Sequence, residues 1–156
     1  MLTVAEKNKN PGCVKQGLDP WKGSQTADAS GHAVFDDPVY GFRALYRTLA
    51  QKYMAGKRDL LAIMRDYAPA DDTQGSIAGR PANDPGSYAQ YLSRVTGHAI
   101  GEDLLLVDAA GDPRSMDLMI ALARGIEHYE AGREWATQAQ RVGGLALYMQ
   151  DFVRIG

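Results

Sequence analysis

Apolar residues recur at spacings of three and four along four segments of the chain, which is the pattern of one buried helical face. These segments predict helices over residues 38–56, 59–67, 85–96 and 115–130. Asp37-Pro38 and Asp84-Pro85 open the first and third helices with a capping aspartate and a proline in the first turn. Gly132 follows the fourth helix, where a glycine commonly ends a helix.

The two ends of the chain follow different patterns. Residues 1–36 lack helical periodicity and are rich in turn signals, so they predict an irregular, ordered loop region anchored by Trp21. Within this region, residues 32–35 predict a short extended strand. A final amphipathic segment from about residue 135 to residue 152 predicts another helix, with an interruption at Gly143-Gly144.

A long polar stretch separates the second and third predicted helices. Residues 69–83 combine Gly, Asp and Pro with few apolar anchors, so we expect a mobile loop that closes over a groove. Helices joined by short links, with one such loop, predict a mainly α fold.

Composition narrows the class of protein. The 156 residues, 45% of them hydrophobic, suffice for one domain that buries a core without disulfides or metals. The net charge of -2 gives no reason to expect nucleic-acid binding, and no apolar run predicts a transmembrane segment. The polar N-terminus does not have the pattern of a signal peptide. Because phosphate-loop, dinucleotide and zinc motifs are missing from the sequence, we expect no cofactor and no metal.

The strongest candidate for chemistry is Glu130, at the end of the fourth predicted helix. The negative end of the helix dipole, together with partial burial, favours the neutral acid and raises the pKa of such a carboxyl group. Glycosidic cleavage needs a neutral acid to protonate the leaving oxygen. The same position also suits a solvated helix-end glutamate beside a capping glycine, and the residues alone leave both interpretations open.

Other side chains suit binding or alternative chemistry. A sugar-binding groove lined by aromatic rings is one interpretation, with core packing as the other, for Trp21, Tyr40, Tyr67, Tyr88 and Tyr91. A thiol nucleophile at Cys13 would need one of three scattered histidines as its base, and the sequence positions none of them beside it. His98 and His128 together with a carboxylate would suit a metal site, but surface or core hydrogen bonding is the commoner role of such histidines.

The N-terminal third carries a motif. Lys9-Asn-Pro-Gly-Cys-Val-Lys15, Trp21-Lys-Gly23 and Ala33-Val-Phe-Asp-Asp-Pro-Val-Tyr-Gly-Phe-Arg-Ala-Leu45 together resemble the "NPGN…W.G…F..F.SP.YGIRAL" pattern of a family of phage structural proteins. Tyr67-Ala-Pro69 with Asn83-Asp-Pro-Gly-Ser-Tyr88 resembles the family's "WAPP.END…Y" after an insertion, and Tyr129-Glu130-Ala-Gly132 resembles its closing "HENG". The resemblance covers residues 8–132.

The same blocks are similar to parts of lysozyme-like glucosaminidases and lytic transglycosylases, in which a helix ending "ESG" carries the catalytic glutamate. Here the Glu-Ala-Gly helix comes last instead of first. The resemblance therefore implies a lysozyme-like domain over residues 1–132, circularly permuted, with residues 133–156 as a helical extension that packs on the domain or docks a partner. The chain departs from the phage family at Cys13, Tyr67 and Tyr129, where that family has Asn, Trp and often His.

The resemblance implies a virion protein, made in the host cytoplasm, that cleaves peptidoglycan with Glu130 as general acid. It also implies substrate contacts from Trp21, Tyr40, Asn83, Asp84 and Tyr88. Lytic transglycosylation needs one carboxyl group, whereas hydrolysis normally needs a second, for which the loop candidates are Asp37, Asp71, Asp72 and Asp84. The main alternative is a non-catalytic tail or head-completion protein that binds other virion proteins. A bacterial toxin or effector with the same fold is more distant.

Overall fold

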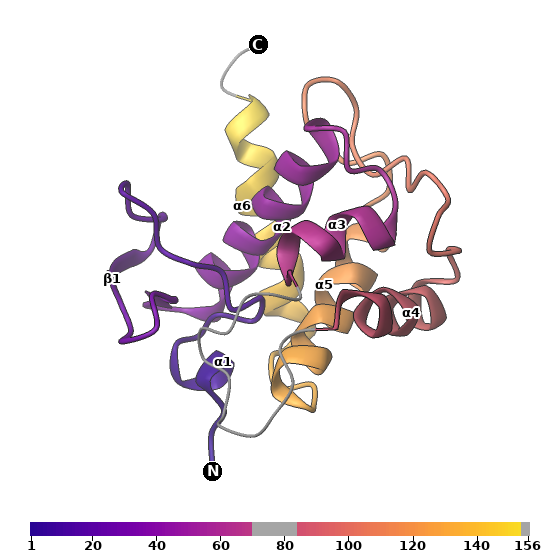
Figure 1. The fold of residues 1–156 in the computed structure, drawn as a ribbon. Helices are drawn as coiled ribbons and strands as arrows, with labels where there is room; N and C mark the ends of the chain where they lie inside the picture. Colours follow the sequence, from indigo (N-terminus) through magenta and orange to yellow (C-terminus); the bar gives the residue numbers. More distant parts are fainter. Residues whose placement is uncertain (70–83, 154–156) are drawn as a thin grey trace.

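The computed structural model describes residues 1–69 and 84–153 (Figure 1). It confirms a mainly α, single small domain. The described elements are α1 (Val4–Lys7), β1 (Ser24–Ala27), β2 (Ala33–Phe35), α2 (Pro38–Met54), α3 (Leu60–Tyr67), α4 (Pro85–Thr96), α5 (Met116–Ala131) and α6 (Gln138–Val153).

The four helices predicted from periodicity are present as α2 to α5, with bounds within two residues of those predicted. Each begins at a side chain that accepts a hydrogen bond from a backbone N–H in the first turn; these caps are Asp37, Asp59, Asp84 and Ser115. Gly97 and Gly132 end α4 and α5 at φ values of 79° and 76°, a left-handed conformation that suits glycine.

The N-terminal region is more regular than its composition predicts. The strand expected over residues 32–35 is present as β2, which pairs antiparallel with β1, and neither β1 nor α1 was predicted. A reciprocal pair of hydrogen bonds between Thr3 and Glu6 caps α1. Arg133, just after α5, forms an ion pair with Glu6 and so connects α1 to the segment between α5 and α6.

The expected interruption at Gly143-Gly144 is wrong, because α6 runs through both glycines. A Cβ atom on Gly144 would lie 2.9 Å from the carbonyl oxygen of Val39 and 3.0 Å from the backbone nitrogen of Arg43, both on α2. Gly144 therefore allows two helix backbones to approach closely, a packing role that periodicity does not reveal.

The main hydrophobic core surrounds α2, and α6 packs along it (Figure 1). Phe42, Leu45 and Tyr46 of α2 are fully buried. From α6, Leu145 and Tyr148 belong to the same core, and the Tyr46 hydroxyl donates a 2.9 Å hydrogen bond to the Arg141 carbonyl. The residues after Gly132 thus complete the core that α2 begins.

A smaller cluster lies where the two-stranded sheet meets α2. Its buried members are Val14, Ala33, Phe35 and Ala44, with Trp21 and Tyr40 packed against them.

Several sequence predictions fall on undescribed residues. Asn83, Asp71 and Asp72 lie outside the described residues, as does the expected mobile loop except Pro69. Within the described residues, no helix is both long and apolar enough to cross a membrane.

Candidate active site

Glu130 lies in the last turn of α5, two residues before the capping Gly132. Its carboxylate Oε1 accepts a 3.1 Å hydrogen bond from the hydroxyl of Tyr88, a buried residue of α4. Glu130 itself keeps part of its surface exposed. The carboxyl group is therefore held in place by a hydrogen bond, on a residue that is only partly buried.

Burial raises the pKa of Glu130 from its ordinary 4.5 to about 7, while the hydrogen bond from Tyr88 acts in the opposite direction. The expectation of a raised pKa is thus confirmed, with desolvation as its main cause. A carboxyl group with this pKa is a mixture of acid and carboxylate near neutral pH. That is the state required of a group that first donates and then recovers a proton.

Three tyrosine rings form a continuous stack beside this carboxyl group. The Tyr67 ring of α3 meets the Tyr88 ring edge-on, with 6.3 Å between the ring centroids. The Tyr129 ring of α5 stacks on the Tyr88 ring, with 3.8 Å between the ring centroids. Burial, followed by the proximity of Glu130, raises the pKa of the Tyr67 and Tyr88 hydroxyls well above the ordinary value. Both phenols therefore stay neutral, and Tyr129, 39% exposed, presents aromatic surface to solvent.

Gly12 and Cys13 of the N-terminal motif lie beside Tyr67 and Glu130. The Tyr67 hydroxyl donates a hydrogen bond to the Gly12 carbonyl. Cys13 follows with φ 48°, close enough to Glu130 that the carboxylate, after burial, raises the pKa of the thiol. Since the thiol is kept protonated, this environment is the opposite of one that activates a nucleophilic cysteine.

Asn10 organises the turn that carries Gly12 and Cys13. Its fully buried side chain donates to the carbonyls of Val14 and Ala33, each at 2.9 Å, and accepts from the Val14 N–H at 3.0 Å. Gly41 on α2 lets this turn pack closely, because a Cβ there would lie 2.7 Å from Pro11 Cδ. Part of each motif block thus lies near Glu130: the turn at residues 9–15, Tyr67 with Tyr88, and Tyr129.

A second carboxylate borders the stack. Asp84 caps α4, and hydrogen bonds from the Ser87 backbone and hydroxyl lower the pKa of its carboxyl group. Burial raises the pKa of the Tyr129 hydroxyl, and the nearby carboxylates of Asp84 and Glu130 raise it further. One carboxyl group with a raised pKa and one with a lowered pKa therefore lie near the same ring, an arrangement that separates acid from base roles.

Not every predicted contact is brought together here. Trp21 and Tyr40 belong to the smaller cluster under the two-stranded sheet, where the Trp21 indole nitrogen donates to the Lys15 carbonyl at 2.9 Å. Within the described residues, no hydrogen bond or ring contact joins either of them to Glu130. Asn83 lies outside the described residues. Tyr88 contacts Glu130 directly, and Asp84 borders the stack.

Glu127, one turn before Glu130, has a purely structural environment. It is fully buried and accepts hydrogen bonds from Arg141 at 2.8 and 3.1 Å and from the backbone of Trp135 and Ala136. Glu127 is therefore unsuitable as a control for Glu130, because its loss removes the hydrogen-bonded charge partner of the buried Arg141. The sequence pattern predicts no binding role for Tyr129, whose ring stacks on Tyr88, and it leaves Tyr67 open between a groove and the core.

Within the part of the chain that the structure describes, no group of three or more His, Cys, Asp or Glu side chains is arranged to hold a metal ion. Comparison of the chain with models of protein families gives no match, and comparison with curated proteins gives no significant match.

Proposed function

We propose that this protein cleaves the glycan strands of peptidoglycan, with Glu130 as the general acid. The observation that carries the proposal is a buried carboxyl group, on a residue that is itself only partly buried, whose pKa burial raises to about 7 beside the exposed ring of Tyr129. Neutral sugars favour aromatic surface, and their glycosidic bonds need a proton donor at the leaving oxygen.

In the first step, the Glu130 carboxyl proton passes to the glycosidic oxygen as the bond from that oxygen to the anomeric carbon breaks. Negative charge then develops on the Glu130 carboxylate. The Tyr88 hydroxyl already donates to this carboxylate, and such a bond strengthens when its acceptor becomes charged. In the second step, the carboxylate removes a proton from the hydroxyl that attacks the anomeric carbon.

The attacking hydroxyl distinguishes two reactions. If it belongs to the substrate sugar, the product is an anhydro sugar and Glu130 is sufficient. If it belongs to water, a second carboxylate normally assists, and Asp84 is the described candidate near Tyr129. We favour the intramolecular reaction, because within the described residues Glu130 is the carboxyl group with a raised pKa.

The test is a turbidity and zymogram assay on purified peptidoglycan, with mass spectrometry of the products. Glu130→Gln keeps the size of the side chain and removes the transferable proton, so it should lower the rate by about 10²–10⁴. Glu102→Gln, which changes an exposed glutamate outside the site, is the matched control and should retain activity. Products lighter than hydrolysis products by one water would identify transglycosylation.

Full activity of Glu130→Gln would eliminate the catalytic proposal and favour the non-catalytic virion protein. The assignment to a phage virion rests on the sequence motifs alone.

A further inference from the structure

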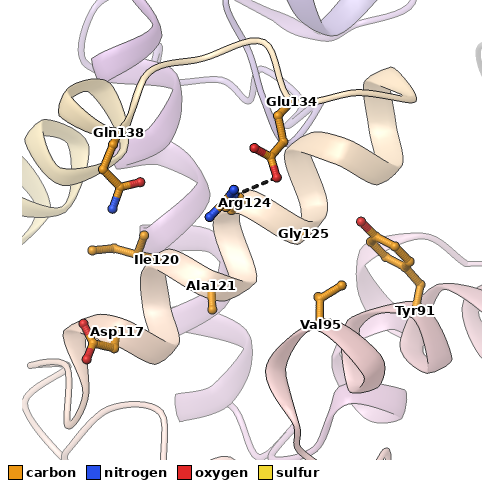
Figure 2. Close-up of a pocket in the computed structure, with 9 residues that line it drawn as sticks. All are labelled: Tyr91, Val95, Asp117, Ile120, Ala121, Arg124, Gly125, Glu134 and Gln138. Carbon is orange, nitrogen blue, oxygen red and sulfur yellow. Dashed lines mark hydrogen bonds and ion pairs between the residues drawn. The ribbon is translucent and has the colours of Figure 1, made fainter.

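A concave feature lies along α5, and neither Glu130 nor Tyr88 lines it. Figure 2 shows this pocket between α4, α5 and the start of α6, and its volume is about 490 Å³. Gly125 forms part of its wall, and a Cβ there would lie 2.9 Å from Leu92 and 3.0 Å from Val95. The glycine therefore lets α4 approach α5 closely at this wall.

The lining combines apolar surface with planar polar groups. Tyr91, Val95, Ile120 and Ala121 supply the apolar part. The polar part comes from Asp117, Arg124, Glu134 and Gln138, and a 2.7 Å ion pair joins Arg124 to Glu134 across the pocket (Figure 2). With two carboxylates and one guanidinium group, the lining has a formal charge of −1 and does not favour an anionic ligand. Apolar faces beside fixed hydrogen-bonding groups suit a neutral sugar ring.

The pocket is connected to the candidate active site by aromatic rings. The Tyr91 ring lies 5.5 Å from the ring of Tyr129, which in turn stacks on Tyr88 at 3.8 Å. At 1.5 Å of rise per residue, the pocket wall runs along α5 from about 8 Å to about 20 Å before Glu130, from Gly125 back to Asp117. A chain of sugars bound at Glu130 has the length to reach it, whereas a single sugar does not.

From this continuity and this lining we infer that the pocket is a distal subsite for neutral, N-acetylated sugar units of the glycan strand cleaved at Glu130. Sugar rings lie against Tyr91 and Ala121, and Arg124 and Gln138 donate hydrogen bonds to hydroxyl or acetamido oxygens. The subsite holds long strands more tightly than short ones and takes no part in proton transfer. This inference rests on the proposed function for the identity of its ligand.

The test measures binding in the Glu130→Gln background, so that catalysis does not enter. The probes are glycan strands freed of their peptides and a tetrasaccharide fragment of them. Ala121→Trp fills the pocket, and Ala146→Trp places the same ring at an exposed helical alanine on α6, outside the pocket. We expect Ala121→Trp to weaken long-strand binding about tenfold, with unchanged tetrasaccharide binding and an unaffected control. Arg124→Ala, at an exposed position, should weaken long-strand binding in the same direction and serves if Ala121→Trp does not fold.

The outcomes separate the inference from the proposed function. Equal long-strand affinity in Ala121→Trp and Ala146→Trp overturns the subsite, even if the wild-type protein cleaves peptidoglycan. Failure of the Glu130→Gln protein to bind the long strands also overturns it. A selective loss in Ala121→Trp supports the subsite even if the wild-type protein shows no cleavage, in which case only the proposed function fails.

Discussion

Glu130→Gln should stabilise the protein, and by an amount that grows with pH. Burial raises the pKa of Glu130 from 4.5 to about 7 in the folded chain, so the folded state holds more protons than the unfolded state between these values. Wild-type stability from this group is therefore complete below pH 4.5 and is lost as the pH rises through 7. Glutamine has nearly the same shape and never ionises, so the variant lacks this loss.

The size of the effect follows from the two pKa values. Relative to low pH, the raised pKa of Glu130 lowers the unfolding free energy of the wild type by about 0.2 kcal/mol at pH 4, about 2 kcal/mol at pH 6 and about 3 kcal/mol at pH 8. The difference in unfolding free energy between Glu130→Gln and wild type should increase by these amounts, whatever its value at low pH. Activity should fall as stability rises, because the buried acid that destabilises the fold is the group required for catalysis.

Urea denaturation of both proteins at pH 4, 6 and 8 measures this difference, since contributions from all other groups cancel. Glu134→Gln is the control of opposite sign, because the pKa of Glu134 is lowered by its hydrogen bond to Arg124. That substitution should lose stability relative to wild type as the pH rises, and only slightly, since the pair is exposed. A difference for Glu130→Gln that stays constant from pH 4 to pH 8 would refute the reasoning that Glu130 is a desolvated acid.

Four further predictions concern Glu130, its neighbour Tyr88, the buried Glu127 and the close helix packing at Gly144. Cleavage of peptidoglycan should decline above an apparent pKa near 7 in its pH profile, and a rate that keeps rising to pH 9 would contradict Glu130 as the acid. Tyr88→Phe removes a hydrogen bond that favours the carboxylate, so NMR titration of Glu130 should show a higher pKa, and a lower one would count against the contact. Glu127→Gln should lose about 3–5 kcal/mol in urea denaturation by breaking a buried ion pair, and a loss near zero would argue against that pair. Gly144→Ala should lose about 1–3 kcal/mol through overpacking, whereas Gly143→Ala, whose Cβ would lie 3.6 Å from Val39, should not; equal effects would exclude close packing as the cause.

Much of the candidate site could be anticipated from short-range signals. A glutamate placed two residues before a helix-ending glycine is visible in the sequence, and so is the apolar face that anchors its helix. The resemblance of the motif blocks also grouped Tyr88 and Asp84 with Glu130, but it grouped Trp21 and Tyr40 with them, and these two lie in the smaller cluster. Such signals do not show which way each side chain of the helix points. Glu127 and Glu130 are three residues apart on α5, yet Glu127 pairs with Arg141 and Glu130 accepts a hydrogen bond from Tyr88.

The local pattern was sufficient for the four helices α2 to α5, because their caps, glycine ends and apolar faces depend on neighbours within a few residues. Long-range packing decided the rest. Whether Gly144 breaks a helix or admits α2 depends on residues about a hundred positions away. The buried Glu127 likewise depends on Arg141, which belongs to the next helix, α6. The raised pKa of Glu130 belongs to the same class, because desolvation requires the assembled surroundings of α3, α4 and the N-terminal turn rather than any property of the helix end itself.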